Sequence, residues 1–178
     1  ELFPVSFPGV KTSHDDIVVA VDKDRLIERV QAHLSGQSQP AYSPEKIVRY
    51  CYRPMDVRWL YWDETILDRA RPEYFPHVQP DNLFLFTTGR TRKNLIEAPI
   101  FTRLLNDLNL MDSGARGFPL YLYTAPQKSQ LGLFETDPQP LSGRRPNLSD
   151  QAKAYLAEVG FTPEDGAPLL FYHTLAVL

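Results

Sequence analysis

Proline is the residue type that most restricts how this chain can fold. The sequence contains 16 prolines among 178 residues, about 9% where an average protein has about 5%. Proline lacks a backbone donor and interrupts helices and central strands. Because these prolines fall mostly between candidate elements, the sequence predicts many short elements joined by irregular connections. Hydrophobic residues make up 43% of the chain, which suffices for a packed core and excludes disorder of the whole.

The candidate elements favour an α+β fold. Apolar spacing and capping residues predict helices, and β-branched or aromatic runs predict strands. The expected helices are 23–34 with Asp22 as its cap, one that begins at Ser43-Pro44-Glu45 and ends before Pro54, 148–159, and 163–178. The expected strands are 17–21, 57–62, 83–88 and 118–123, with 99–105 either a strand or a short helix. Since the strands lie between helical ends, we expect a small antiparallel or mixed sheet of short strands with flanking helices.

Several classes of protein are excluded by what the sequence lacks. The single cysteine, Cys51, cannot form an internal disulfide or a cysteine-pair metal site, which fits a reducing, cytoplasmic setting. The four histidines have no metal-binding spacing, and no apolar run approaches the roughly 20 residues of a membrane span. The sequence also contains no G-x-S-x-G, no Gly-rich cofactor loop, and no Asn-Pro-Pro-Tyr segment of the kind that adenine methyltransferases use. We therefore expect no catalytic residue, cofactor or metal ion in this chain, and no membrane partner.

The net charge of −3 means that any basic, nucleic-acid-binding surface must be local. The first candidate is Lys11-Thr12, which follows Gly9 and could contact a phosphate. The upstream glycine of a phosphate-binding loop is missing, so a structural role for Lys11 is equally compatible with the sequence. The neighbouring Asp15 and Asp16 could form an acid–base pair, but the favoured interpretation is that one of them satisfies backbone donors of the turn.

Aromatic residues and arginines are interleaved between Tyr50 and Asp63, which makes this segment the second candidate. Aromatic rings can stack on bases while guanidinium groups, here those of Arg53 and Arg58, hold phosphates or read guanine edges. The alternative, which composition alone favours, is a strand whose aromatic side chains pack inward while Arg58 pairs with Asp56 or Asp63.

The third candidate is a turn that follows a predicted strand and combines hydroxyls, an amide and three cations around Gly89. Cations this close repel one another unless an anion is near, so the turn favours contact with a DNA phosphate over a merely solvated loop. Its candidate residues are Thr88, Arg90, Arg92 and Lys93. The pair Arg144-Arg145 is a weaker case, and we expect it to be solvated.

Five segments, in this order, resemble the C-terminal part of type ISP restriction–modification enzymes. Such enzymes combine a nuclease, a translocase, an adenine methyltransferase and a target recognition domain in one polypeptide. The segments are Leu2-Phe3-Pro4 through Asp15-Asp16, Tyr52-Arg53-Pro54-Met55-Asp56 with Arg58-Trp59-Leu60-Tyr61, Asn82-Leu83 through Gly89-Arg90, Phe118-Pro119-Leu120-Tyr121-Leu122-Tyr123, and the run from Leu170 to Leu178. The usual residue of the family at position 55 is Phe, so Met55 is a modest departure at an expected packing site.

The resemblance implies that residues 1–35 are the tail of the methyltransferase domain with its connector, and that residues 36–178 are the target recognition domain, truncated at its C-terminus. Both ends of the chain would then be fragment boundaries. The implied function is a DNA target-recognition module whose partners are double-stranded DNA and the methyltransferase domain of the same parent chain. S-adenosylmethionine, ATP and Mg²⁺ would belong to other parts of that parent. The alternative is a non-catalytic module that docks protein through the same aromatic strands.

Overall fold

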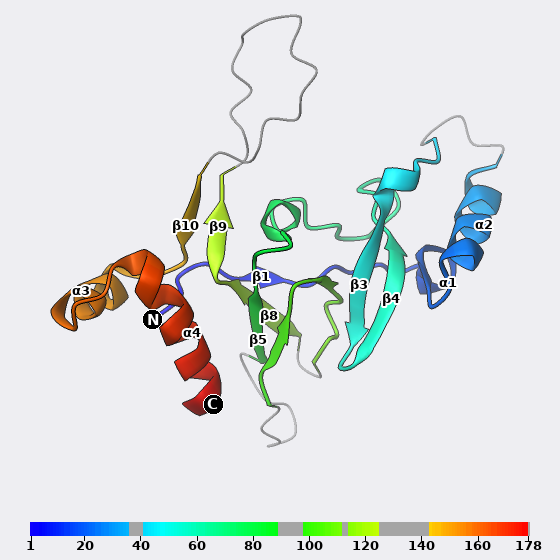
Figure 1. Cartoon of the computed structure of the whole chain (residues 1–178). Helices are drawn as coiled ribbons and strands as arrows, with labels where there is room; N and C mark the ends of the chain where they lie inside the picture. Colours follow the sequence, from blue (N-terminus) through cyan, green and yellow to red (C-terminus); the bar gives the residue numbers. More distant parts are fainter. Residues whose placement is uncertain (36–40, 89–97, 112–113, 125–142, 178) are drawn as a thin grey trace, which may run out of the picture.

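The computed structural model describes residues 1–35, 41–88, 98–111, 114–124 and 143–177 of the chain (Figure 1). Its helical elements are α1 (Asp15–Val18), α2 (Lys23–Leu34), the 3-10 turns η1 (Pro44–Lys46) and η2 (Phe75–His77), α3 (Asp150–Glu158) and α4 (Pro163–Val177). Its strands are β1 (Phe7–Pro8), β2 (Val19–Ala20), β3 (Ile47–Arg53), β4 (Asp56–Tyr61), β5 (Phe84–Thr88), β6 (Ile100–Thr102), β7 (Leu105–Asn106), β8 (Ala115–Pro119), β9 (Tyr121–Tyr123) and β10 (Arg144–Pro146). Most elements are short, as the proline content predicts.

In the described part of the chain the strands form two four-stranded sheets and a two-stranded ribbon. The first sheet has the order β1-β8-β5-β6 and is antiparallel throughout. The second has the order β2-β4-β3-β7 and is mixed, because β3 and β7 run parallel. β9 and β10 form the antiparallel ribbon. With α1 and α2 at one end of the molecule and α3 and α4 at the other (Figure 1), the α+β prediction is confirmed.

The helix that the sequence predicts best is α2, which begins and ends as expected. The Asp22 carboxylate accepts a hydrogen bond from the backbone N–H of Arg25 at 2.8 Å and so caps the first turn. Leu26, Val30 and Leu34, one helical turn apart, are all buried. α4 also follows its prediction, whereas α3 is shorter than expected because Ser149 caps it.

The segment after Ser43 is a strand and not the predicted helix. Only Pro44–Lys46 is helical, as a single 3-10 turn, and Ile47–Arg53 then runs as β3. β3 pairs with β4 from Ile47 opposite Tyr61 to Arg53 opposite Asp56. The β-branched and aromatic residues of this segment suit a strand, and the neighbouring β4 supplies the hydrogen bonds that decide between two compatible apolar patterns.

Two predicted strands are interrupted. Residues 15–18 form one helical turn, α1, in which the backbone N–H groups of Ile17 and Val18 both donate to the carbonyl of His14, so only Val19–Ala20 is extended. The run 118–123 is divided at Leu120, where the chain leaves the first sheet as β8 and enters the ribbon as β9. The segment 99–105, left open between strand and helix, contains β6 and the start of β7.

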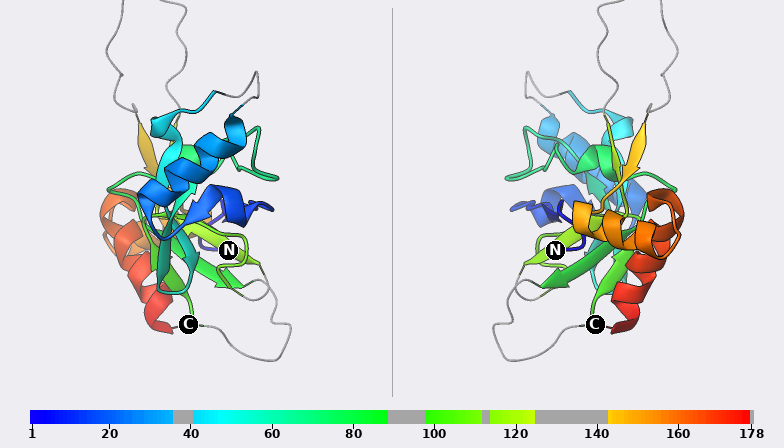
Figure 2. Two further views of the ribbon diagram at one scale, coloured as in Figure 1. Left: turned by 90° about the vertical axis from the view of Figure 1, so that its right-hand side faces the viewer. Right: turned by 90° about the vertical axis from the view of Figure 1, so that its left-hand side faces the viewer.

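β5 lies between two hydrophobic cores and contributes side chains to both. Its side chains alternate, so Phe84 and Phe86 lie in the core that includes Tyr50 of the second sheet. Leu85 lies in the other core, with residues of α3 and α4 such as Phe171. Figure 2 shows α4 beside the first sheet, which places the second sheet and the helical pair on opposite sides of β5.

The first 35 residues share these sheets and cores. β1 pairs with β8, with Phe7 opposite Gly117, and β2 pairs with β4, with Val19 opposite Leu60. The assignment of residues 1–35 to the end of a neighbouring domain stays a prediction. Within the described residues, no helix has the length and apolar character needed to cross a membrane.

Candidate nucleic-acid interface

The hairpin of β3 and β4 holds two of the candidate DNA-contacting residues, Arg53 and Arg58. The Arg58 guanidinium binds both carboxylate oxygens of Asp56, with Nε–Oδ1 and Nε–Oδ2 distances of 3.1 Å and an Nη2–Oδ2 distance of 2.7 Å. This charge-assisted contact lowers the pKa of the Asp56 carboxyl below its usual value. Of the two partners that the sequence offered for Arg58, Asp56 forms the ion pair, and Asp63 pairs with Lys46.

Arg53 is fixed by a second carboxylate and by the same aromatic ring as Arg58. Its Nη1 donates to Asp107 Oδ1 at 2.9 Å. Both guanidinium groups lie over the Tyr52 ring, with each Cζ 4.0 Å from the ring centroid. The Tyr52 hydroxyl donates to Asp15 Oδ2 at 2.8 Å, and this hydrogen bond, followed by burial, raises the pKa of Tyr52. The hairpin end therefore presents two oriented, partly exposed guanidinium groups on a fixed ring.

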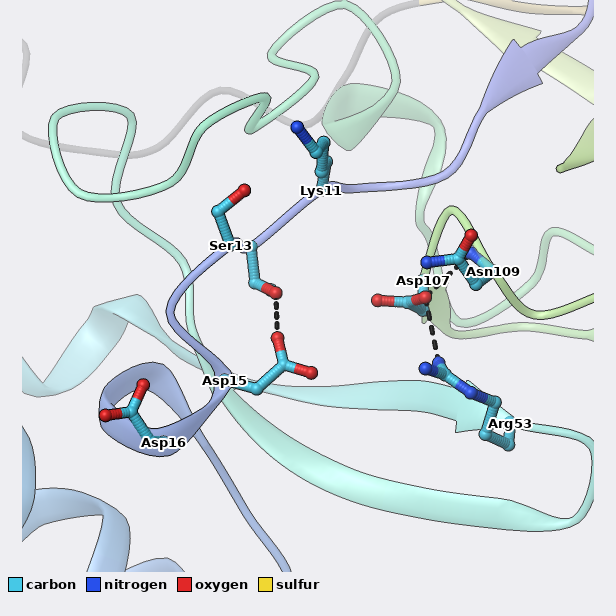
Figure 3. Close-up of a pocket in the computed structure, with 8 residues that line it drawn as sticks. Lys11, Ser13, Asp15, Asp16, Arg53, Asp107 and Asn109 are labelled. Carbon is cyan, nitrogen blue, oxygen red and sulfur yellow. Dashed lines mark hydrogen bonds and ion pairs between the residues drawn. The ribbon is translucent and has the colours of Figure 1, made fainter.

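Lys11, Thr12 and Arg53 line one open polar pocket of about 320 Å³ (Figure 3). It lies between the segment before α1, the end of β3 and the turn after β7. The remaining residues that line it are Ser13, Asp15, Asp16, Asp107 and Asn109. Lys11 Nζ forms an ion pair with Asp68, a residue that does not line the pocket. The pocket offers carboxylates, an amide and cations together, which suits a ligand that both donates and accepts hydrogen bonds.

Thr12 and Asp15 have structural roles in this pocket. Thr12 is buried, and its hydroxyl donates to the Asp15 carboxylate. Because Asp15 also accepts from Tyr52, it is committed to two side-chain donors and joins α1 to the hairpin. Asp15 thus satisfies side-chain donors where the sequence favoured backbone donors. Asp16 is exposed beside it.

Asp107 and Asn109 line this site, and the sequence did not single out either of them. Asp107 is the more connected of the two. It is 4% exposed and accepts hydrogen bonds from the Tyr50 hydroxyl, from Arg53 and from the backbone N–H of Asn109, the last at 2.7 Å. Burial, followed by the adjacent Asp107 carboxylate, raises the pKa of Tyr50. The only signal in the sequence is a polar pair, Asn106-Asp107, between two leucines, and that signal does not indicate which residues it meets.

Thr88, the remaining described candidate, lies at the end of β5 opposite Ala115 of β8. This end of β5 and the turn between β3 and β4 point to the same side of the molecule, the lower side in Figure 1. Arg90, Arg92 and Lys93 lie outside the described residues, so their DNA-contacting role stays a prediction.

The family of the chain follows from its sequence. The profile described as the Type ISP C-terminal specificity domain matches residues 30–178. The chain belongs to this family. No curated protein matches the specificity domain significantly.

Three solved structures share the fold of this specificity domain. They are a DrdV–DNA complex determined by cryo-electron microscopy (TM-score 0.67, 19% identity, 88% of this chain), the ATP-dependent Type ISP restriction-modification enzyme LlaBIII bound to DNA (0.68, 17%, 93%), and a nuclease-deletion mutant of the Type ISP restriction-modification enzyme LlaGI with a DNA substrate mimic (0.63, 16%, 88%). This chain spans only 17%, 12% and 15% of the lengths of those chains, respectively.

The register of the first sheet adds one cation to the specificity domain that sequence reasoning missed. Arg116 of β8 lies opposite Thr87 of β5 and is exposed. Its guanidinium donates to Ser6 Oγ at 2.8 Å and to the Ser6 carbonyl at 2.9 Å. The alternation of β8 is not legible in its sequence, because Gly117 and Pro119 flank the only aromatic residue of the strand.

Arg144, in contrast to the expectation of a solvated pair, is engaged within the specificity domain. Its Nη1 contacts Asp81 Oδ2 at 2.6 Å, and its Cζ lies 4.4 Å from the centroid of the Tyr121 ring. The ribbon of β9 and β10 brings these residues together, and that pairing cannot be read from a Pro/Gly/Ser-rich connection. In the ranges that the structure describes, no three His, Cys, Asp or Glu residues are grouped closely enough to hold a metal ion.

Proposed function

We propose that this specificity domain recognises a DNA target sequence for a larger restriction–modification enzyme. The match of residues 30–178 to the Type ISP specificity profile carries the proposal. All three structural neighbours described above were determined with DNA or a DNA mimic. The methyltransferase, translocase and nuclease, together with S-adenosylmethionine, ATP and Mg²⁺, are then functions and cofactors of the rest of the parent. Residues 1–35 would connect this domain to the methyltransferase domain, in the cytoplasm.

We assign different roles to two groups of residues: those of the hairpin end would contact base edges, and others would contact phosphates and position the DNA. Arg53 and Arg58 are oriented by Asp107 and Asp56, and their side chains remain 38% and 31% exposed. A guanidinium held in a fixed plane is suited to bidentate recognition of a base edge or a phosphate. We assign the phosphate contacts to Thr88, Arg90, Arg92 and Lys93. Such contacts fix the register of the protein on the duplex.

Charge reversal of three cations tests this proposal. We expect the variant Arg90→Glu/Arg92→Glu/Lys93→Glu to lose affinity for duplex DNA. Binding would neutralise fewer phosphates and would therefore release fewer counterions from the DNA. The slope of log K against log salt should fall in magnitude by up to about 2.7, at about 0.9 for each of three phosphates. Fluorescence anisotropy of a labelled random-sequence duplex across a salt series measures the slope.

The matched control reverses three cations on other elements, Arg25 of α2, Arg145 of β10 and Lys153 of α3, and so produces the same net charge. We expect this control to keep a slope close to that of the unchanged protein. Equal losses in both triple variants would show a response to net charge alone, and unchanged binding in the first would contradict the assignment of its three residues to phosphate contacts.

A second function, protein docking, is supported by an apolar surface between α3 and α4. Tyr155, Val159, Phe161 and Leu169 are between 44% and 54% exposed, and they line a concavity of about 360 Å³ with His173. Apolar groups gathered in this way are typical of a surface that another domain covers. Changing Tyr155 and Leu169 to Ser should leave DNA affinity unchanged if this surface only docks protein, and a loss of DNA affinity would instead place DNA on it.

A further inference from the structure

The turn between β3 and β4 exposes one apolar side chain completely. Pro54 and Met55 form this turn, and the relative exposure of Met55 is 101%. The expectation that position 55 is a packing site is therefore wrong. A methionine with full exposure contributes nothing to the core, so packing against the described residues does not account for an apolar residue here.

The backbone at Met55 also favours a different residue. Met55 has a φ of 62°, in the left-handed region that glycine and asparagine adopt at lower cost than other residues. A proline followed by a residue with positive φ is the pattern of a type II turn, in which the second position is usually Gly. The chain thus bears a conformational cost at this position to present a side chain that touches no other part of the described structure.

The hairpin end behind Met55 is held by two ion pairs, and a cation lies on each strand beside the turn. Arg53 and Asp56 pair on either side of the turn, and both carry an ion pair, Arg53 with Asp107 and Asp56 with Arg58. The Tyr52 ring lies under both guanidinium groups. An apolar side chain at the tip of a hairpin, with two oriented and partly exposed guanidinium groups beside it, matches a polyanion that has apolar stacked groups inside. This is the chemistry of a nucleic acid duplex.

We propose that Met55 is a wedge that inserts between stacked bases of duplex DNA, while Arg53 and Arg58 contact the flanking phosphates or base edges. This inference rests on the proposed function of the domain. Methionine is one of the apolar residues that proteins use to unstack a base step, and its unbranched thioether chain is long enough to reach past the backbone of the turn. Unstacking would let the domain recognise how easily a sequence deforms as well as its base edges.

Oxidation of methionine gives a direct test, because the chain has only two methionines. Met55 is fully exposed, and Met111, at 3% exposure, is an internal standard. The protein is treated with hydrogen peroxide, alone and with a random-sequence duplex at low salt, and sulfoxide at each methionine is measured by mass spectrometry. We expect the duplex to slow oxidation of Met55 and to leave Met111 unchanged. Equal oxidation of Met55 with and without bound DNA would overturn the wedge.

Fluorescence of duplexes that carry 2-aminopurine in place of adenine in one strand reports the unstacking itself. The protein should raise the fluorescence, Met55→Leu should keep the rise, and Met55→Gly should abolish it and weaken binding about tenfold. Gly suits the positive φ, so Met55→Gly should fold at least as stably as the unchanged protein. The matched control is Val21→Gly, which removes another exposed apolar side chain and should behave as the unchanged protein.

The outcomes separate this inference from the function on which it rests. Salt-dependent DNA binding with no 2-aminopurine response contradicts the wedge and leaves DNA recognition standing. No DNA binding at low salt contradicts both. Protection of Met55 by a protein partner in the absence of DNA would assign the tip to a protein interface and overturn the proposal.

Discussion

Asp63 ties the end of β4 to the turn that precedes β3. Its side chain is 2% exposed and accepts hydrogen bonds from Lys46 Nζ at 2.6 Å, from Thr65 Oγ1 at 2.6 Å and from the backbone N–H of Thr65 at 2.8 Å. Burial alone would raise the pKa of this carboxyl, but the hydrogen bonds from Lys46 and Thr65 outweigh burial and lower it. The ionised form of Asp63 is therefore a source of stability for the hairpin on which the candidate site is built.

We predict that the protein becomes less stable as the pH is lowered, because Asp63 becomes protonated. A carboxyl whose pKa is lower in the folded state stabilises the protein above its unfolded value, near 3.8, and this contribution is lost as the pH falls through the folded value. Asp63→Asn should be less stable than the unchanged protein by about 2 kcal/mol at pH 7, and the difference should shrink below pH ~4. Urea denaturation at a series of pH values measures it. Glu158→Gln, at the exposed end of α3, is the control, and a difference that stays constant down to pH ~2 would refute the role of ionised Asp63.

A helix or strand could be predicted from the sequence when the interactions that stabilise it lie within its own segment. α2 follows from its own residues, because Asp22 and the apolar stripe lie within one segment. β3 does not, because its partner strand decides between two patterns that both fit Ile47 to Cys51. β10 could not be predicted at all, since Arg144 and Pro146 form a strand only through pairing with β9.

The candidate site shows the same limit. Arg53 and Arg58 are legible as an aromatic and arginine pattern within one hairpin. Asp107, which orients Arg53, lies 54 positions away along the chain, and Lys11 reaches the pocket from a third segment. Residues that lie close together only in the folded chain cannot be recognised from spacing, whereas the pattern of the hairpin alone indicates the chemistry.

The Asn82 side chain hydrogen-bonds backbone groups at the point where the chain passes from β8 of the first sheet to β9 of the ribbon. We predict that loss of this side chain destabilises the sheet and the ribbon. Asn82 is fully buried, accepts from the backbone N–H groups of Leu83 and Tyr121, and donates to the carbonyls of His77 and Tyr121, at distances between 2.8 and 3.0 Å. Asn82→Ala should lower the free energy of unfolding by about 3 kcal/mol, because it leaves buried backbone groups without partners. Chemical denaturation measures this change. Asn109→Ala, at an exposed position, is the control, and an equal effect of both substitutions would contradict the prediction.

For the whole molecule, the architecture separates two surfaces. The turn between β3 and β4 and the end of β5 lie on the lower side of the molecule in Figure 1, and the turn carries Met55. α3 and α4 lie at the left of the same view and line an apolar concavity. With a net charge of −3, the chain has no general attraction for DNA. Specific contacts must then supply more of the binding than in a strongly basic domain, which is appropriate for a module that selects one site among many.

Target recognition by this domain is tested most directly by selection of duplexes from a random-sequence library, followed by sequencing of the bound fraction. If the domain recognises a target, repeated selection should enrich one short sequence. The enrichment should weaken when Arg53 and Arg58 are changed to Lys, which keeps the charge and loses the bidentate geometry. Bound duplexes that remain random after repeated selection would contradict target recognition.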